Sequence, residues 1–530
     1  MHLHSPRRWI SVFAVALIVI AGIASAALAG DGKNPMLAGR NGWTSESLFT
    51  VGDSVGSYTP VGVLDGLAAW DIGGGTVRAL ANHELGFNAG AFYSLANGTS
   101  LQGARVSFFD IDTATRTVVS AGLAYDTVYD RLGQVVTSPA QINERNDPNG
   151  GFDRFCSSHG YSAGDFGLVD DIYFTAEESS TGFGSPHGGS FWALDMANGD
   201  IYALPDFGRG SWENVTAVDT GSNRHVAFIL GDDSSLTGAP LYLYVGVKRP
   251  GTFLERNGLT GGRLFAWAPA DSSKKTPQDF NGTGSSLRGR FVPIAARDLS
   301  KAGQPGYDAQ GYLDDKTLQN SAYAAGAFQF SRPEDVATNP DLGTQVVLAS
   351  TGNGAVFPAD NWGDTYVISL KMSERSLSLR EPIVATVVIA YDGDEPGNQA
   401  QGLRSPDNLD WADDGLIYIQ EDRATVPSSL FAPPGTPEAS IWSLNPKTSV
   451  IEHVAEIDRS VVYPLDATDP SAADRGNWES SGVLDVSHLF DVGSGTVLLV
   501  DMQAHSIRDG SIGGSTSLVE GGQLLLLWEE

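Results

Sequence analysis

Short apolar runs that alternate with polar turns are the feature of this sequence that most restricts its fold. One run ends at Asp112, is followed by the polar residues 113–116, and resumes at Thr117. Pairs of apolar runs joined by turn residues are typical of β-hairpins. Few windows show helical periodicity, so an all-β fold is expected. The clearest hairpins are predicted at residues 106–119, 191–204, 366–379 and 441–454.

The recurrence of these hairpins predicts a β-propeller, in which blades of four strands surround a central channel. Their spacing is irregular, which indicates a divergent repeat with long loop insertions. We expect one propeller domain over residues 30–530, with an inserted loop at 270–326 that is rich in Ser, Gly, Lys and Asp. A β-sandwich or two unrelated β domains are the alternatives.

The first 29 residues have the pattern of a signal peptide. Arg7 and Arg8 precede a stretch without charged residues from Trp9 to Gly30, which contains the small-residue run at 27–29. This pattern predicts cleavage after Ala29 and an exported protein that is periplasmic, secreted or on the cell surface. The arginine pair leaves the twin-arginine and general export routes open. An uncleaved anchor is the alternative, because about 20 apolar residues span a bilayer.

The charge of the chain excludes several kinds of partner. The sequence has 33 Lys and Arg against 63 Asp and Glu, a formal net charge of −30. Nucleic acids and anionic membranes attract clustered basic residues, so neither is expected as a partner, nor is a membrane after signal cleavage. The single cysteine, Cys156, excludes an internal disulfide and zinc-finger spacings. Nothing indicates an obligate interface, and a monomer is expected.

Acidic residues recur where predicted strands begin or end. Glu84 follows Asn82 and His83, and Glu213 lies among aromatic residues. In a propeller such strand ends converge on one mouth of the channel. A ring of carboxylates there requires cations, because like charges at close range cannot all stay ionised without compensation. The other acids of this kind are Glu177, Glu178, Glu334, Asp407 and Glu421.

Cys156 adds a different kind of ligand to these acids. A lone thiol in an exported protein is either buried and inert or bound to a metal. A thiolate together with carboxylates suits a transition metal such as iron better than calcium, which takes oxygen ligands.

Two short sequence motifs give weaker evidence of function than these acids and Cys156. The G-x-S-x-G match at residues 52–56 lacks the following helix of a nucleophile elbow, so Ser54 is not expected to be a nucleophile. Residues 392–397 begin like a calcium loop, but Leu403 occupies the twelfth position, where an EF-hand has Glu. Weak calcium binding and a solvated turn are both open for this segment.

The order of these pieces resembles the PhoX-type alkaline phosphatases, from about Ala81 to Met502. No single piece is specific, but their order is. The pieces are Asn82-His83-Glu84, Cys156, Glu177-Glu178, Glu213, Gly231-Asp232-Asp233, Arg332-Pro333-Glu334, Pro406-Asp407-Asn408-Leu409, Glu479-Ser480-Ser481-Gly482 and Asp501-Met502-Gln503.

The resemblance implies a six-bladed propeller that holds ferric iron and calcium, is exported by the twin-arginine route, and hydrolyses small phosphate monoesters. Carried over by position, it makes Arg332 the residue that holds the substrate phosphate. It makes Cys156, Glu213 and Glu334 iron ligands. It gives five further acids as candidate calcium ligands: Glu84, Glu177, Glu178, Asp407 and Glu421.

The sequence also departs from that family. Residues 163–169 replace the usual Trp-Gly-Thr stretch, and Gln503-Ala504-His505 stands where Gln-His-Pro-Gly is usual. The acids Glu177 and Glu178 follow Thr-Ala rather than Thr-Cys, 21 residues after Cys156. Two other functions therefore stay open: a calcium-dependent propeller lactonase or esterase, and a non-catalytic calcium-binding surface propeller. Metal content separates them from the phosphatase.

Overall fold

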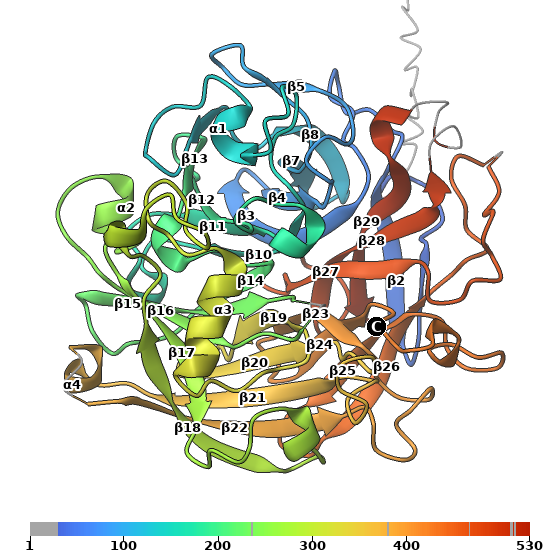
Figure 1. The fold of residues 1–530 in the computed structure, drawn as a ribbon. Helices are drawn as coiled ribbons and strands as arrows, with labels where there is room; N and C mark the ends of the chain where they lie inside the picture. The colour runs from blue at the N-terminus through green and yellow to red at the C-terminus, as the bar shows by residue number, and fades with distance from the viewer. Residues whose placement is uncertain (1–29, 235–236, 379–380, 466, 509–511, 513–515) are drawn as a thin grey trace, which may run out of the picture.

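The computed structural model of the chain describes residues 30–530 except 235–236, 379–380, 466, 509–511 and 513–515 (Figure 1). The predicted signal peptide, residues 1–29, lies outside the described residues. Among the helices of the described part, none is long and apolar enough to cross a membrane.

Six blades surround one channel in the described part of the chain (Figure 1). Blade 1 contains β3 (Leu64–Gly73), β4 (Thr76–His83), β7 (Arg105–Asp112) and β8 (Thr117–Leu123). Blade 2 contains β10 (Phe155–Tyr161), β11 (Ile172–Glu177), β12 (Phe191–Asp195) and β13 (Asp200–Ala203), with β9 (Thr127–Tyr129) parallel to β13 at the edge. Blade 3 contains β14 (Trp212–Ala217), β15 (His225–Asp232), β16 (Tyr242–Val247) and β17 (Arg263–Pro269).

Blade 4 contains β19 (Pro333–Thr338), β20 (Gln345–Ser350), β21 (Asp364–Lys371) and β22 (Ile383–Asp392). Blade 5 contains β23 (Pro406–Trp411), β24 (Ile417–Glu421), β25 (Ser440–Asn445) and β26 (Val450–Ile457), with β1 (Leu37–Gly39) at its edge. Blade 6 contains β27 (Glu479–Asp485), β28 (Val497–Arg508), β29 (Glu520–Glu529) and β2 (Trp43–Thr50).

The remaining elements lie in the connections between strands. Strands β5 (Tyr93–Ser94) and β6 (Ser100–Leu101) form a small hairpin. The short helices are α1 (Ala140–Asn143), α2 (Phe253–Arg256), α3 (Asp315–Ala324) and α4 (Glu374–Leu377). The 3₁₀ turns are η1 (Asp165–Gly167), η2 (Thr181–Phe183), η3 (Pro205–Phe207), η4 (Pro277–Asp279), η5 (Leu299–Lys301), η6 (Ser428–Leu430) and η7 (Thr516–Leu518).

The ring is closed by strands from the two ends of the chain. The inner strands β3, β10, β14, β19, β23 and β27 contact one another in this order, and β27 contacts β3. The outermost strand of blade 6 is β2, which pairs with β29 near the C-terminus. This arrangement confirms the predicted β-propeller, because blades are added around the channel until the first and last meet.

Apolar side chains fill the space between neighbouring blades. Between blades 2 and 3, Phe174, Phe207 and Phe228 are fully buried with Tyr244. The rings of Phe207 and Tyr244 are stacked with their centroids 4.0 Å apart. This packing holds the blades rigidly, and it leaves polar residues for the strand ends that face the channel mouth.

Three of the predicted hairpins are confirmed, at residues 106–119, 191–204 and 441–454. The fourth is wrong in its second half, because residues 374–377 form helix α4 rather than a returning strand. Ser373 caps this helix through a bond from the Ser376 backbone amide, so the chain turns before β22 begins at Ile383. The predicted insertion at 270–326 contains β18 (Ser286–Ile294), which joins β17 of blade 3 to β22 of blade 4, and helix α3.

Candidate metal centre

All six inner strands begin at the same mouth of the channel, each with an irregularity of register in its first residues. A bulge of this kind re-aims a side chain away from the regular alternation of the strand. In blades 1 to 5 the second residue of the inner strand is an acid or a cysteine, and in blade 6 the first residue is an acid. These residues are Asp65, Cys156, Glu213, Glu334, Asp407 and Glu479.

The second strand of each blade ends at the same mouth, since it runs antiparallel to the inner strand. In five blades the first residue after that strand is polar or acidic. These residues are Glu84, Glu178, Asp233, Thr351 and Asp422. The mouth is therefore built from two sets of side chains, inner-strand starts and second-strand ends.

Seven of these residues form three overlapping ligand groups, in each of which the donor atoms lie within 4.8 Å of one another. Cys156 belongs to two groups and Glu213 to two, so the groups form one continuous chain of donors. The groups are Asp65, Glu84 and Cys156; Cys156, Glu178 and Glu213; and Glu213, Glu334 and Asp407.

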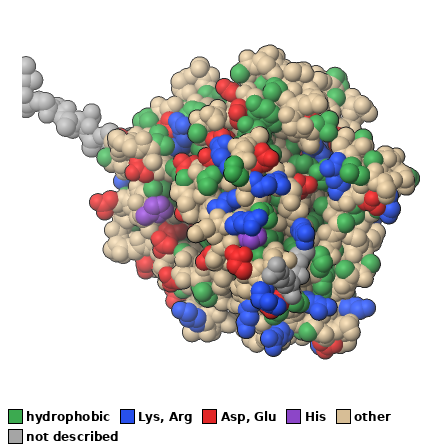
Figure 2. All heavy atoms as spheres, turned by 90° about the vertical axis from the view of Figure 1, so that its left-hand side faces the viewer, with side chains coloured by type: hydrophobic (Ala, Val, Ile, Leu, Met, Phe, Trp, Pro, Cys, Tyr) green, Lys and Arg blue, Asp and Glu red, His purple; other side chains and the backbone are tan. Residues whose placement is uncertain are grey.

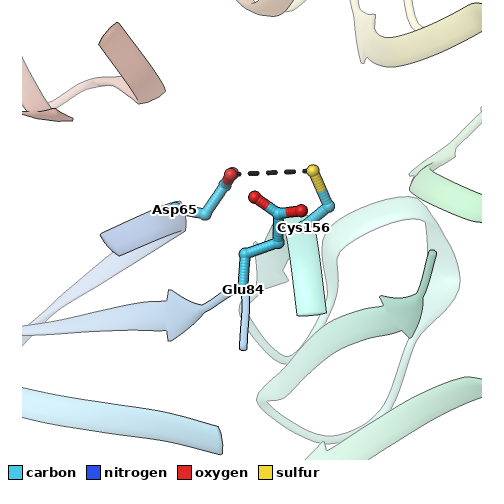
Figure 3. Close-up of side chains that lie close together, drawn as sticks. All are labelled: Asp65, Glu84 and Cys156. Carbon is cyan, nitrogen blue, oxygen red and sulfur yellow. Dashed lines mark hydrogen bonds between the residues drawn. The ribbon is translucent and has the colours of Figure 1, made fainter. Parts of the chain in front are cut away.

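Figure 3 shows how the first group converges, with Asp65 of β3, Cys156 of β10 and Glu84, which directly follows β4, directed toward one another. The Cys156 thiol donates to Asp65 across 3.6 Å between Sγ and Oδ2 (Figure 3). Gln503 also donates to the same Asp65 oxygen, at 3.0 Å. These contacts hold the inner-strand start of blade 1 beside that of blade 2.

Burial dominates the electrostatics of the mouth. It raises the pKa of Glu84 to about 7, and it raises the pKa of Glu213 well above the usual range, with Glu334 and Glu178 adding to the effect. Burial and the neighbouring Asp65 likewise raise the pKa of the Cys156 thiol. One oxygen of Glu213, Oε1, is buried without a hydrogen-bond partner in the described residues. Buried acids that lack partners fit a site that holds cations.

The donor types indicate which cations would fit. The groups that contain Cys156 combine sulfur with carboxylate oxygen, which suits a transition metal such as iron. The group of Glu213, Glu334 and Asp407 offers oxygen alone, which also suits calcium.

Arg332 lies at the edge of these groups, directly before β19. Its Nε donates to Asp233 Oδ1 at 2.9 Å, and its Nη2 lies 2.9 Å from Glu334 Oε1. Its side chain remains 17% exposed. Arg154 occupies the matching position before β10, and its Nη2 donates to Glu178 Oε1 at 2.7 Å. Two guanidinium groups thus face the acids of the mouth from blades 2 and 4.

The backbone before four of the inner strands is in the left-handed region, although none of the four residues is glycine. Their φ angles are 56° at Val63, 48° at Arg154, 57° at Arg332 and 43° at Ser405. A β-branched residue such as Val63 adopts this conformation rarely. Such strain clusters at functional sites, where the surrounding structure maintains it.

The structure brings most of the predicted site residues together. Cys156, Glu213, Glu334, Glu84, Glu178 and Asp407 lie in the ligand groups, and Arg332 lies beside them. Glu177 and Glu421 lie one residue earlier than the mouth positions and outside these groups. Glu177 accepts hydrogen bonds from the Ser190 amide and the Trp192 indole, and Glu421 is paired with Arg404.

The predicted site residues do not include Asp65, Asp233, Asp422, Glu479 or His505, although Asp422 and Glu479 are acids at predicted strand ends. Asp65 has no aromatic neighbour in the sequence, and only its place as second residue of an inner strand marks it. His505 lies 2.8 Å from Glu520 and 3.2 Å from Glu479. Burial opposes a charge on His505, but these two acids outweigh it and raise its pKa well above the usual range.

Sequence comparison identifies the group of proteins to which this chain is similar. The family model of the alkaline phosphatase PhoX matches residues 199–450, which include Glu213, Arg332, Glu334 and Asp407. Over this range, which is just under half of the chain, the sequence is similar to the PhoX alkaline phosphatases. The chain is accordingly a phosphatase, and the resemblance seen in the sequence is confirmed. Among curated protein sequences, none matches the chain.

One solved structure supports the fold. The structure of Pseudomonas fluorescens PhoX in complex with vanadate, a transition state analogue, is 15% identical to the chain with a TM-score of 0.58. The match covers 93% of this chain and 96% of that one. The β-propeller domain of the trilobed protease from Pyrococcus furiosus is 7% identical with a TM-score of 0.28, over 83% of this chain and 93% of that one. At 15% identity, the likeness to the Pseudomonas fluorescens structure concerns the fold alone.

Proposed function

We propose that this phosphatase hydrolyses small phosphate monoesters at the propeller mouth, with iron and calcium held by the three ligand groups. The observation that carries the proposal is the continuous chain of seven donors, which includes one thiol and lies beside Arg332. Cys156, Glu178 and Glu213 would hold iron, with Glu178 in place of the Glu334 that the resemblance implies. The group of Glu213, Glu334 and Asp407, which consists of carboxylates alone, would hold calcium. When bound, these cations would stabilise the negative charge that develops on the phosphate in the transition state.

The protein's own residues would bind and orient the substrate. A mouth of carboxylates alone would repel a phosphate, so substrate binding depends on positive charge. Arg332 supplies a planar fork of donors that matches phosphate oxygens. Asp233 fixes this fork from one side through Nε and Nη2, at 2.9 and 3.2 Å. The Nη1 group makes no hydrogen bond within the described residues, so it can donate to the substrate.

We further propose that the chain is exported and that residues 1–29 are its signal peptide. The charge pattern of the N-terminus supports this proposal. N-terminal sequencing of the secreted or periplasmic protein is expected to begin at Gly30. A protein retained in the cytoplasm with an intact N-terminus would contradict it.

The test of function is hydrolysis of p-nitrophenyl phosphate by the purified mature chain, before and after chelation. We expect turnover that is lost on chelation and restored by iron and calcium together. A calcium-dependent lactonase would instead cleave a lactone with calcium alone and leave the phosphate ester intact. Absence of both activities and of bound metal would favour a non-catalytic propeller.

A further inference from the structure

A separate acidic cluster lies in blade 4, outside the ligand groups of the mouth. It consists of Asp360, Asp364, Asp392 and Asp394. The first three are buried, with 1%, 3% and 4% of their surfaces exposed, and Asp394 is half-buried. Asp364 is the first residue of β21 and Asp392 the last of β22, and the two are directly paired across the strands. Residues paired in this way have their Cβ atoms about 4.5–5.5 Å apart.

Asp360 is the unusual member of this cluster. Both of its carboxylate oxygens are buried without a hydrogen-bond partner in the described residues. The Ser331 hydroxyl and the Gly363 amide lie close enough to this carboxylate to lower its pKa, but neither forms a hydrogen bond of normal geometry with it, and the Ser331 hydroxyl also has no partner within the described residues. Buried polar atoms in folded proteins are nearly always paired, so three unpaired oxygen atoms side by side indicate a missing ligand.

The other three acids each keep some coordinating capacity. Asp364 accepts one hydrogen bond, from the Tyr366 hydroxyl at 2.7 Å. Both oxygens of Asp392 accept backbone amides, from Gly282 at 2.7 Å and Asp394 at 2.8 Å. For Asp394, only Oδ2 accepts hydrogen bonds, both at 2.9 Å from backbone amides. A carboxylate oxygen has two lone pairs, so each can still reach a cation.

Within the part of the chain that the structure describes, these acids have no positive side chain as a counter-charge. Among the described residues, no Lys or Arg forms an ion pair with any of the four. Burial raises the pKa of Asp360 well above the usual range, and the neighbouring Asp394 and Asp392 raise it further. Burial and Asp360 have the same effect on the pKa of Asp364.

We propose that this cluster binds one calcium ion, with Asp360 and Asp364 as its main ligands and Asp392, Asp394 and Ser331 as its other oxygen donors. The donors are all oxygen atoms, which calcium prefers, and the cluster offers neither sulfur nor imidazole. The proposal also accounts for residues 392–397, which begin like a calcium loop although they lack the acid that ends an EF-hand. The first and third positions of that loop, Asp392 and Asp394, lie in the cluster.

The proposed calcium ion lies behind the turn that carries Arg332. Ser331 directly precedes Arg332, and the Ser350 hydroxyl donates to the Ser331 carbonyl at 2.7 Å. The Thr351 amide donates to the Arg332 carbonyl at 3.1 Å. A cation bound to Ser331 and Asp360 would therefore stabilise the left-handed conformation of Arg332, at φ 57°. This ion has a structural role, and the proposal does not depend on the chemistry at the mouth.

The test is the Asp360→Asn variant of the mature chain, which removes a ligand charge while keeping the size of the side chain. We expect elemental analysis to find one calcium per chain fewer than in the wild type, with the iron content unchanged. The thermal midpoint is expected to be lower and less dependent on added calcium. Asp341→Asn is the matched control, because it removes the charge of an exposed acid in the same blade, and it should keep the full calcium content.

A folded Asp360→Asn variant with the calcium content of the wild type would overturn the proposal. If this variant does not fold, Asp394→Asn replaces a half-buried ligand instead. Terbium, a calcium substitute, is then titrated into both proteins while tryptophan is excited, because the Trp362 backbone amide donates a hydrogen bond to Asp394 at this site. We expect the variant to bind one terbium ion fewer; equal binding by the two proteins would overturn the proposal.

Discussion

The buried acids of the mouth and the buried acid Glu421 of blade 5 have opposite surroundings. Glu421 is paired with Arg404 through two hydrogen bonds, at 3.0 and 2.7 Å, and both side chains are fully buried. Arg404 also donates to the Phe431 carbonyl at 2.6 Å. At the mouth, Glu213 has other carboxylates as its nearest charged neighbours and keeps one oxygen without a partner.

This difference separates structural acids from ligand acids, even where they are adjacent in the sequence. Glu177 and Glu178 differ by one position, as do Glu421 and Asp422. Because successive side chains of a strand point to opposite sides, one acid of each pair enters the blade and the next faces the mouth. A buried acid whose counter-charge belongs to the chain stabilises the fold, whereas one without a counter-charge is available to a cation.

Most of the acidic excess that remains is at the surface. On the face in Figure 2, basic and acidic side chains lie among apolar ones, although the chain has a formal net charge of −30. The total charge of the chain did not locate the site. The buried acids without partners do.

Removing the counter-charge of Glu421 should have the largest effect on stability. Arg404→Ala leaves Glu421 buried without its counter-charge, which typically destabilises a protein by about 3–5 kcal/mol. Chemical denaturation should show this loss, while the metal content of the folded protein stays at the wild-type level. A variant with wild-type stability would show that the pair does not stabilise blade 5.

Replacing an acid of the mouth that has no counter-charge should lower the catalytic rate rather than the stability. Glu213→Gln alters the residue shared by two ligand groups, and we expect kcat for p-nitrophenyl phosphate to fall by about 100-fold or more, since even partners of metal ligands cost about 10–100-fold. Circular dichroism should show a folded protein. Wild-type turnover in a folded variant would exclude Glu213 from the metal centre.

Arg332→Ala tests the substrate clamp beside the ligand groups. A hydrogen bond to a charged group contributes about 1.5–3 kcal/mol, so KM should rise by about 10–100-fold while iron and calcium remain bound. Arg332→Lys keeps the charge without the planar fork and should recover part of the loss. An unchanged KM in both variants would place the phosphate elsewhere.

The smallest effects come from the adjacent pair in blade 2. Glu177→Gln should lower the free energy of unfolding by about 1–3 kcal/mol, because the Ser190 amide and Trp192 indole lose their charged acceptor. Glu178→Gln should instead lower the metal content with little loss of stability. The same response from both variants would remove the distinction between structural and ligand acids.

Local features made much of the fold predictable from the sequence. The hairpin at 191–204 turns at Asn198 and Gly199, and such turns are set by a few adjacent residues. The prediction of a strand at 376–379 was wrong because the cap at Ser373 favours a helical turn. The apolar residues that follow Ser373 resemble those of a strand. The closure of the ring by β2 and β29 depends on residues at opposite ends of the chain, so no local pattern reveals it.

The site was predictable where the neighbouring residues are distinctive. Cys156 and Glu213 could be identified because a lone thiol and an acid among aromatic residues are unusual. The sequence does not show which of Glu177 and Glu178 faces the mouth. That depends on strand register, which only the folded blade defines. Asp65 was missed because Leu64-Asp65-Gly66 reads like the end of a turn, and its neighbours at the mouth come from β10 and β28.

The most direct test of the proposed metal centre is the metal content of the purified mature protein and its Cys156→Ser variant. We expect iron and calcium in the wild type, and loss of iron from a folded Cys156→Ser protein together with loss of phosphatase activity. Equal iron in both proteins, or a wild type that hydrolyses phosphate monoesters without bound iron, would contradict the proposal.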